Sequence, residues 1–407
     1  MPGNTMRIAI FSDSFYPEIG GIQDSIIALG TQLAGRGHAL FYYVPRHPKR
    51  HYTIAKLPYG EISLGPNIHI RRFFAVPYPG PTRQASAVIP TGLRWIAMQK
   101  EKFDVIHTQT FFGVGLEALA AAKFLRVPIV GTNHWAISEF KHYSPIAREL
   151  FSRWSVRYAS WYYNHCSYVT GPSRSVIGEM IKNGLTRPHG VVSNPIDTAT
   201  FRPVTPKKKG ELKKKLGLSR ATIVYAGRLA QEKKIDVILR AIPLIKKKIP
   251  AITLAIAGHG SALPELRQMI TRTNIEREVK FFGTLSKPLL AELYQASEVF
   301  VIMSTSETQS MVLLQAMACG LPAIAADWRA LPEYVNENNG FLVPPGNERL
   351  LAERFTHLMG NPALRESLGK GAHASVQNFS PEKIAARWET IYDNAIKNFG
   401  HAAPQNP

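Results

Sequence analysis

Short apolar runs alternate with amphipathic helical patterns from one end of the chain to the other. Near the start, the run RIAIF (7–11) is followed by a loop and then by four apolar residues at the three- and four-residue spacing of a helix face. These four residues are Ile22, Ile26, Leu29 and Leu33. The run ALFYYV (39–44) comes next, so the pattern predicts a strand, a loop, a helix and a second strand.

The same alternation continues through the rest of the chain. It predicts further strands at 103–108, 127–132, 167–171, 222–227, 252–258, 279–283, 299–303 and 322–326. Strands that alternate with helices favour parallel sheets covered on both faces. The predicted fold class is therefore α/β, with two Rossmann-like domains facing one another across a cleft and a ligand site at the carboxyl ends of the strands.

The break between the two series of strands predicts the domain boundaries. Residues 1–196 are expected to form one domain and residues 197–380 the other. The pattern of residues 381–399 predicts a helix that folds back on the N-terminal domain, and the residues after it, up to 407, are expected to be a disordered tail.

The composition excludes several classes of protein. The chain has 407 residues, of which 45% are apolar, too many for a disordered chain. Its two cysteines, Cys166 and Cys319, offer no disulfide framework and favour a reducing compartment. The sequence has no run of 18 apolar residues and no signal-like N-terminus, so a transmembrane or exported protein is disfavoured and a cytoplasmic location is expected.

The formal net charge of +20 indicates an acidic partner. Residues 1–195 carry +11 of it, and +7 lies in 202–220, which is interpreted as a linker followed by one or two exposed helical turns. Residues 140–163 place arginines among four aromatic residues on one helix face. These are Phe151, Trp154, Tyr158 and Trp161. Such a face either packs in the core or meets anionic lipid headgroups. Nucleic acid is less favoured because no helix-turn-helix, zinc-ligand or RNP-like pattern occurs.

Two motifs carry groups suited to a phosphorylated ligand. Gly20 and Gly21 precede a helix, where backbone amides can approach a phosphate, although a tight turn is the commoner use of such a pair. Arg228 and Lys233 follow a strand and suit a diphosphate, the alternative being a solvated surface pair. Neither the glycine pair nor GHGSAL (258–263) matches the dinucleotide fingerprint, so a nicotinamide enzyme lacks support.

A third motif, SETQSMVLLQAMACGLPAIAA (306–326), is the most informative. It leads from a strand into a helix that is predicted to begin near Thr308. Glu307 is therefore expected at the rim of the site, with the free amides of the following residues pointing into it. Those residues are Thr308, Gln309, Ser310 and Met311. Gln315 is expected about two turns down the helix, within reach of a hydroxylated ligand.

In this order and spacing, the three motifs resemble the retaining glycosyltransferases of family 4, which have the two-domain GT-B architecture. The resemblance covers the chain from Met6 to about Asn398. It implies a sugar nucleotide held mainly by the C-terminal domain and an acceptor held by the N-terminal domain.

The resemblance also implies roles for individual residues. Gly20 and Gly21 would offer amides to the donor phosphates, while Arg228 and Lys233 would neutralise the leaving diphosphate. Glu307 and the amides of the four residues after it would hold the donor sugar and phosphate.

Two histidines match family positions. His134, in VGTNHW, matches a histidine that lies beside the reacting sugar and is interpreted as a site residue. His107, in FDVIHTQT, is interpreted as a hydrogen-bonded histidine at a strand end. The second histidine that often accompanies it is Gln109 here.

Two residues depart from the family pattern. Gln315 stands where the family has the second Glu of its E-x7-E motif, which accepts hydrogen bonds from the ribose. A neutral amide offers a single acceptor oxygen, and losing a charge-assisted bond is expected to cost about 1.5–3 kcal/mol in donor binding. Ser310 stands where glycine is common, so both changes bear on donor identity.

The sequence also bears on mechanism. It contains no Asp-x-Asp pair, so we expect a site without metal or other cofactor, in which Arg228 and Lys233 stabilise the charge that builds on the diphosphate. No carboxylate nucleophile is evident opposite the leaving group. This favours a front-face displacement in which the leaving phosphate acts as base.

The acceptor is predicted from the basic, aromatic N-terminal domain and from NHWAISEFKHYSP (133–145). Both look most like enzymes that glycosylate membrane lipids, such as diacylglycerol glucosyltransferases and phosphatidylinositol mannosyltransferases. We therefore expect hexose transfer from UDP-glucose, or else GDP-mannose, to a lipid such as diacylglycerol at the inner face of an anionic membrane. The alternatives are a glycosyltransferase with a soluble or polysaccharide acceptor, a sugar-nucleotide epimerase, and a binding protein that has lost the chemistry.

Overall fold

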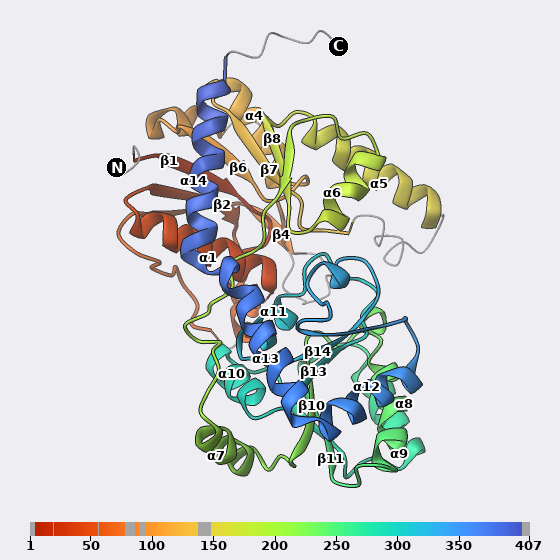
Figure 1. Cartoon of the computed structure of the whole chain (residues 1–407). Helices are drawn as coiled ribbons and strands as arrows, with labels where there is room; N and C mark the ends of the chain where they lie inside the picture. Colours follow the sequence, from red (N-terminus) through yellow and green to blue (C-terminus); the bar gives the residue numbers. More distant parts are fainter. Residues whose placement is uncertain are drawn as a thin grey trace. The chain divides into compact units, whose positions relative to one another are not determined.

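The computed structural model describes residues 5–18, 20–55, 57–77, 86–88, 94–136 and 148–400. The chain divides into two compact units. Unit 1 is formed by Met1–Pro195 and Pro381–Pro407, and unit 2 by Ile196–Ser380. Each unit contains one parallel sheet with helices packed on its two faces (Figure 1). The predicted α/β class with two Rossmann-like sheets is confirmed.

Unit 1 is built on a seven-stranded sheet in the order β3-β2-β1-β6-β7-β8-β9, with every neighbouring pair parallel. Its strands are β1 (Arg7–Phe11), β2 (Ala39–Pro45), β3 (Ile68–Phe73), β6 (Val105–Thr108), β7 (Ile129–Thr132), β8 (Tyr168–Gly171) and β9 (His189–Val191). A separate antiparallel pair consists of β4 (Ala75–Pro77) and β5 (Ser86–Val88).

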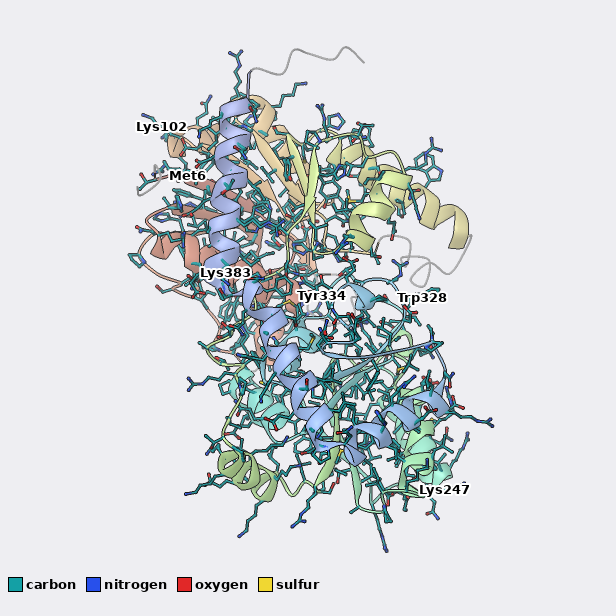
Figure 2. The ribbon with its side chains drawn as sticks, viewed as in Figure 1. Met6, Lys102, Lys247, Trp328, Tyr334 and Lys383 are labelled. Carbon is teal, nitrogen blue, oxygen red and sulfur yellow. The ribbon has the colours of Figure 1, made fainter. Side chains whose placement is uncertain are left out.

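The helices of unit 1 include α14, although this helix follows unit 2 in the sequence. They are α1 (Gly21–Gly35), α2 (Lys49–Ala55), α3 (Trp95–Met98), η1 (Gln99–Glu101), α4 (Val114–Leu125), α5 (Arg148–Tyr163), α6 (Arg174–Lys182) and α14 (Pro381–Asn398). Lys383, labelled in Figure 2, lies in the first turn of α14.

Helices cover both faces of the unit 1 sheet, so both faces are buried. Successive side chains of a strand point to opposite faces and therefore enter different core clusters. Ile8 and Ile10 of β1 belong to one core cluster, to which α1 and α14 contribute. Ala9 and Phe11 belong to the other, to which α4 and α5 contribute. The buried side chains that α14 adds include Ile384, Trp388 and Tyr392.

Unit 2 is built on a six-stranded parallel sheet in the order β12-β11-β10-β13-β14-β15. Its strands are β10 (Ala221–Ala226), β11 (Ile252–Ala257), β12 (Val279–Gly283), β13 (Val299–Ile302), β14 (Ala323–Ala326) and β15 (Gly340–Val343). Its helices are α7 (Pro206–Leu216), η3 (Gln231–Lys233), α8 (Ile235–Lys246), α9 (Leu263–Thr273), α10 (Lys287–Gln295), α11 (Met311–Ala318), η4 (Leu331–Glu333), α12 (Glu348–Gly360), α13 (Pro362–Val376) and η5 (Gln377–Phe379). None of the described helices of the chain is long and apolar enough to cross a membrane.

Within the basic stretch 202–220, residues Pro206–Leu216 form helix α7, whose one buried side chain is Leu212, so the helix is longer than the one or two exposed turns that the sequence predicted. The Thr205 hydroxyl caps the helix, and Gly217 ends it with a φ of 62°. Lys213 forms an ion pair of 2.6 Å with the buried carboxylate of Glu298. The sequence pattern did not reveal this ion pair because Glu298 lies 85 residues after Lys213 in the chain.

Asp13 connects the loop after β1 to the start of α4. Its carboxylate accepts hydrogen bonds from the Thr110 hydroxyl at 2.8 Å and from the Val114 amide at 3.3 Å. Burial raises the pKa of Asp13 to about 7, although both hydrogen bonds act in the opposite direction. Gly113 keeps this contact open, since it has a φ of 38° and a Cβ there would lie 2.8 Å from Asp13 Oδ1.

The Gly371→Ala substitution tests the close packing of α13 in unit 2. A Cβ at residue 371 would lie 1.9 Å from the Asn338 carbonyl oxygen, so the backbone must shift. We expect a loss of about 1–3 kcal/mol in the free energy of unfolding, measured by urea denaturation. The matched control is Gly210→Ala in α7, where a Cβ meets nothing within 4 Å. The control should gain about 0.5–1 kcal/mol, and similar effects of both substitutions would contradict the packing described here.

The Asp13→Asn substitution tests the titration of the buried carboxyl. A pKa raised from 3.8 to about 7 means that the folded state holds this proton more tightly than the unfolded state. The carboxyl therefore stabilises the fold most below about pH 4, and this contribution disappears as the pH rises through about 7. The unfolding free energy of the variant relative to that of the wild type should rise between about pH 4 and pH 7. Above about pH 7 the difference between the two proteins should stay constant. A difference that does not change with pH would show that Asp13 titrates normally.

Candidate functional site

In unit 2 the candidate site residues lie at the carboxyl ends of β10 and β13, which are neighbours in the sheet. Lys233 Nζ is 2.8 Å from Glu307 Oε1 and 3.1 Å from the Ser306 carbonyl oxygen. The Lys233 and Glu307 side chains are only 15% and 10% exposed. Arg228 forms a second ion pair, of 2.8 Å, with Glu232.

These two ion pairs differ in what a ligand could displace. Lys233 and Glu307 fix one another in a mostly buried position, so removing either leaves a charge without its partner. The Arg228 side chain is 37% exposed, and exposed ion pairs contribute only about 0–1 kcal/mol. Arg228 can therefore exchange Glu232 for a phosphate oxygen at small cost.

Glycines allow another loop to pack closely against the residues on either side of Arg228. The loops after β10 and β11 meet through backbone alone, because a Cβ at Gly258 would lie 1.9 Å from the Gly227 carbonyl oxygen. A Cβ at Gly260 would lie 2.2 Å from the Leu229 carbonyl oxygen. The two glycines of GHGSAL are thus needed for the close approach of two loops. The sequence pattern, which was compared only with a dinucleotide-binding motif, did not predict this role.

Helix α11 begins at Met311, three residues later than the sequence pattern predicted. Thr308 and Gln309 therefore lie in the loop that follows β13, and the free amides of the first helical turn start at Met311. Ser310, the N-cap residue, has an extended backbone with φ −85° and ψ 96°, so the helix cannot extend before it.

The two departures from the family pattern lie at the start of α11 and along it. Ser310 is the N-cap residue, and its hydroxyl is buried with no hydrogen-bond partner among the described residues. A buried hydroxyl without a partner is costly, so a ligand oxygen bound there would relieve that cost. Gln315 is half-buried, one turn after Met311.

In unit 1, Gly20 is the N-cap residue of α1 and Gly21 is its first residue. Gly20 has an extended backbone with a φ of 178°, and a Cβ there would meet nothing within 4 Å. Neither the backbone conformation nor the packing requires glycine at this position. The missing side chain leaves the amides at the start of the helix open, where the helix dipole favours an anion.

His134 follows β7, and His107 lies in β6. Both are buried, and desolvation lowers their pKa values to about 4 for His134 and about 3 for His107. The two rings are therefore neutral near pH 7. His107 has hydrogen-bond partners at both nitrogens, the Tyr392 hydroxyl at 2.6 Å and the Thr132 hydroxyl at 2.7 Å, as expected for a structural histidine. His134 Nδ1 is buried and has no partner among the described residues.

His134 lines a small pocket of unit 1. Other residues that line it include Ser25, Gln109, Thr132, Asn194 and Trp388. The Ser25 hydroxyl donates to Asn194 Oδ1 at 2.7 Å, although the two residues are 169 positions apart. No motif in the sequence signals either of them, because their meeting depends on the folded sheet.

Some of the expected features fall outside the described residues, which include only 133–136 of the stretch NHWAISEFKHYSP. Among the described residues, no group of three or more His, Cys, Asp or Glu is placed to hold a metal ion. Cys166 and Cys319 are both free and buried.

Two protein-family models match successive parts of the chain. Residues 19–200 match the model described as Glycosyltransferase Family 4. Residues 208–375 match the model described as Glycosyl transferases group 1.

Several known proteins are similar over nearly the whole chain. The alpha-monoglucosyldiacylglycerol synthase of Streptococcus pneumoniae is 29% identical over 96% of this chain and 86% of its own length. The enzyme of the same name from Acholeplasma laidlawii is 26% identical, with 96% and 98% covered. The N-acetyl-alpha-D-glucosaminyl L-malate synthase of Bacillus anthracis is 25% identical, with 94% and 96% covered.

Solved structures show the same fold. HepE from Anabaena, in complex with UDP, matches with a TM-score of 0.77 and 21% identity over 96% of this chain and 100% of that chain. Sucrose-phosphate synthase from Thermosynechococcus elongatus matches with a TM-score of 0.77 and 21% identity over 96% and 99%. The successive family models over residues 19–200 and 208–375, together with this fold, identify the chain as a glycosyltransferase with a Family 4 domain followed by a group 1 domain.

Proposed function

We propose that this protein is a retaining, metal-independent glycosyltransferase that moves a hexose from a nucleotide sugar, with UDP-glucose favoured, to a hydroxyl of a membrane lipid such as diacylglycerol. The observation that carries the proposal is the buried Lys233–Glu307 pair beside the start of α11. At this place a fixed cation (Lys233), a carboxylate that can accept from sugar hydroxyls (Glu307) and the free amides at the start of α11 lie close together in the loops after β13 and its neighbour β10. The lipid acceptor is supported by the two monoglucosyldiacylglycerol synthases, which are similar over 96% of this chain.

In this proposal unit 2 holds the donor. Arg228 and Lys233 bind the diphosphate oxygens, Glu307 accepts hydrogen bonds from the sugar, and the first amides of α11 with the Ser310 hydroxyl donate to phosphate. As the bond between the sugar and the phosphate lengthens, negative charge builds on the leaving diphosphate. Cations that are already in position stabilise that charge without reorganisation.

The reaction proceeds on one face of the sugar. The acceptor hydroxyl oxygen forms its bond to the anomeric carbon on the side from which the diphosphate leaves, and its proton passes to a phosphate oxygen of that leaving group. Configuration is thereby retained, and no protein carboxylate is needed as a nucleophile. His134, neutral and buried in unit 1, offers a ring nitrogen to a substrate hydroxyl.

The exposed face of α5 supports a membrane-bound acceptor. Trp154 and Trp161 are 70% and 51% exposed, and Arg157, exposed between them, lies on the same helix face. The core side of α5 is made by other residues, among them Val156 and Tyr162. Core packing therefore does not explain the two tryptophans. Indole rings beside an arginine suit the headgroup region of an anionic bilayer, where the protein would act as a peripheral enzyme on the cytoplasmic side.

Product analysis tests the proposed reaction. We expect purified protein with UDP-glucose and diacylglycerol vesicles to give a hexosyl lipid, detected by mass spectrometry, and GDP-mannose to serve as the comparison donor. Product formed only with soluble acceptors would favour the alternative acceptor class. Nucleotide binding without transfer or donor hydrolysis would favour a binding protein, and an isomerised donor of unchanged mass would reveal an epimerase.

Glu307→Ala provides the matching loss of function. It leaves Lys233 buried without its carboxylate and removes the acceptor for sugar hydroxyls, so transfer should fall at least about a hundredfold. The control is Glu292→Ala in α10, which breaks an ion pair of 2.6 Å with the exposed Lys215 of α7 in the same unit. The control should keep normal activity, and normal activity of Glu307→Ala would refute the assigned site.

Vesicle flotation tests the membrane surface. Wild-type protein should float with vesicles that contain anionic lipid and remain with the soluble fraction in neutral ones. Replacing Trp154 and Trp161 with Ser should weaken binding at least about tenfold, since each indole loses its burial among the headgroups. The control Trp328→Ser removes a tryptophan that is 48% exposed on unit 2 (Figure 2) and should leave binding unchanged. Equal recovery of the wild type with both kinds of vesicle would exclude anionic docking.

A further inference from the structure

A buried hydrogen-bonded chain in unit 1 leads from α14 to His134. The Tyr392 hydroxyl lies 2.6 Å from His107 Nδ1. The amide nitrogen of Gln109 lies 3.0 Å from His107 Nε2 and 3.2 Å from His107 Nδ1. The carbonyl oxygen of the same amide lies 2.6 Å from His134 Nε2. All four side chains are at most 5% exposed, so water does not compete with these bonds.

The Gln109 amide has its nitrogen on the side of His107 and its carbonyl oxygen on the side of His134. The short distance of 2.6 Å between the carbonyl oxygen and His134 Nε2 makes that oxygen the partner of His134.

This orientation fixes the proton of His134. A carbonyl oxygen can only accept, so His134 Nε2 carries the proton and donates it to Gln109. A neutral ring has one proton on its two nitrogens, which leaves a lone pair on Nδ1. That nitrogen is buried without a partner among the described residues, and His134 lines the pocket that also contains Ser25 and Asn194.

We propose that Gln109 is a positioning residue that holds His134 in the tautomer whose Nδ1 accepts a hydrogen bond from an alcohol hydroxyl of the donor sugar or of the acceptor. This inference rests on the proposed function. Tyr392 is a second positioning residue, because it holds the His107 ring against which Gln109 is oriented. An amide at position 109 presents its oxygen at every pH, whereas a histidine there would exchange donor for acceptor as it titrates.

The Gln109→Glu variant gives the sharpest test. Its carboxylate beside His134 favours the imidazolium, in which Nδ1 is protonated and can no longer accept. The titratable groups that the structure places around this site are His107 of β6, Tyr163 of α5 and Tyr392 of α14. We expect kcat/KM of the variant to be at least about tenfold lower at neutral pH and to recover as the pH rises. This rising limb of the pH profile should be absent from the wild type.

Two further variants separate positioning from stability. Gln109→Met permits both tautomers of His134 and should lower kcat/KM about tenfold at every pH, without the new limb. Tyr392→Phe should lower it less, in the same direction. Its control is Tyr42→Phe, which removes a buried hydroxyl that donates to the Ile26 carbonyl at 3.0 Å in the same core cluster. Tyr42→Phe should lose stability without a change in the pH profile.

Separate kinetics for the two substrates identify the source of the hydroxyl. If it belongs to the donor sugar, the Gln109 variants change the kinetics of donor hydrolysis in the absence of lipid. If it belongs to the acceptor, donor hydrolysis stays normal and only transfer to diacylglycerol changes. Wild-type pH profiles and kcat/KM for both Gln109 variants would overturn the proposal.

Nitrogen NMR of isotope-labelled histidine tests the tautomer without any turnover. We expect an unprotonated Nδ1 on His134 whose resonance shifts when UDP-glucose and diacylglycerol vesicles are added. A protonated Nδ1 in the wild type, or no shift at saturation with both, would overturn the proposal. Absence of any glycosylated product from an otherwise folded protein would instead refute the proposed function, and the NMR result would still stand.

Discussion

Parallel strand pairing is the constraint on which the rest of this structure depends. Two parallel neighbours end at the same edge of a sheet, and the chain returns to the opposite edge through a helix. The loops after β10 and β13 are therefore brought together in unit 2, and Lys233 meets Glu307 across 74 residues of sequence. In unit 1 the same rule brings the ends of β1, β6 and β7 together, so Asp13, Thr110 and the two histidines gather on one edge.

The two edges differ in their electrostatics because burial acts differently on paired and unpaired groups. In unit 2 each cation has a carboxylate within 2.8 Å, which offsets the cost of desolvating it. In unit 1 the histidines have only neutral partners, so desolvation lowers their pKa values and they lose their charge. A charged edge suits a diphosphate that gains negative charge, and a neutral, hydrogen-bonding edge suits alcohol groups. This contrast supports the proposal that the cations of unit 2 bind the donor diphosphate.

The sequence predicted those parts of the fold that depend on local patterns. Apolar runs identified the central strands of both sheets, because these are buried on both faces. Strands at or near the sheet edges, such as β3 and β9, were missed because most of their side chains are only partly buried and their apolar pattern is weak. The order of motifs likewise placed Arg228, Lys233 and Glu307 at strand ends. It did not show Asp13, Ser25 or Asn194, whose partners come from distant segments, nor that α11 begins only at Met311.

The positions of individual basic residues say more about a binding partner than the total net charge does. The lysines of α7 seemed the most obvious basic feature of the chain, yet Lys209 and Lys213 both reach Glu298 within unit 2, at 3.2 and 2.6 Å. Arg157 is a single residue, but it is exposed on a helix face between two exposed tryptophans. A charge with an internal partner contributes to folding, whereas a charge beside uncovered aromatic surface remains available to a partner. For this reason the case for an anionic membrane rests on the face of α5 and not on the total charge of the protein.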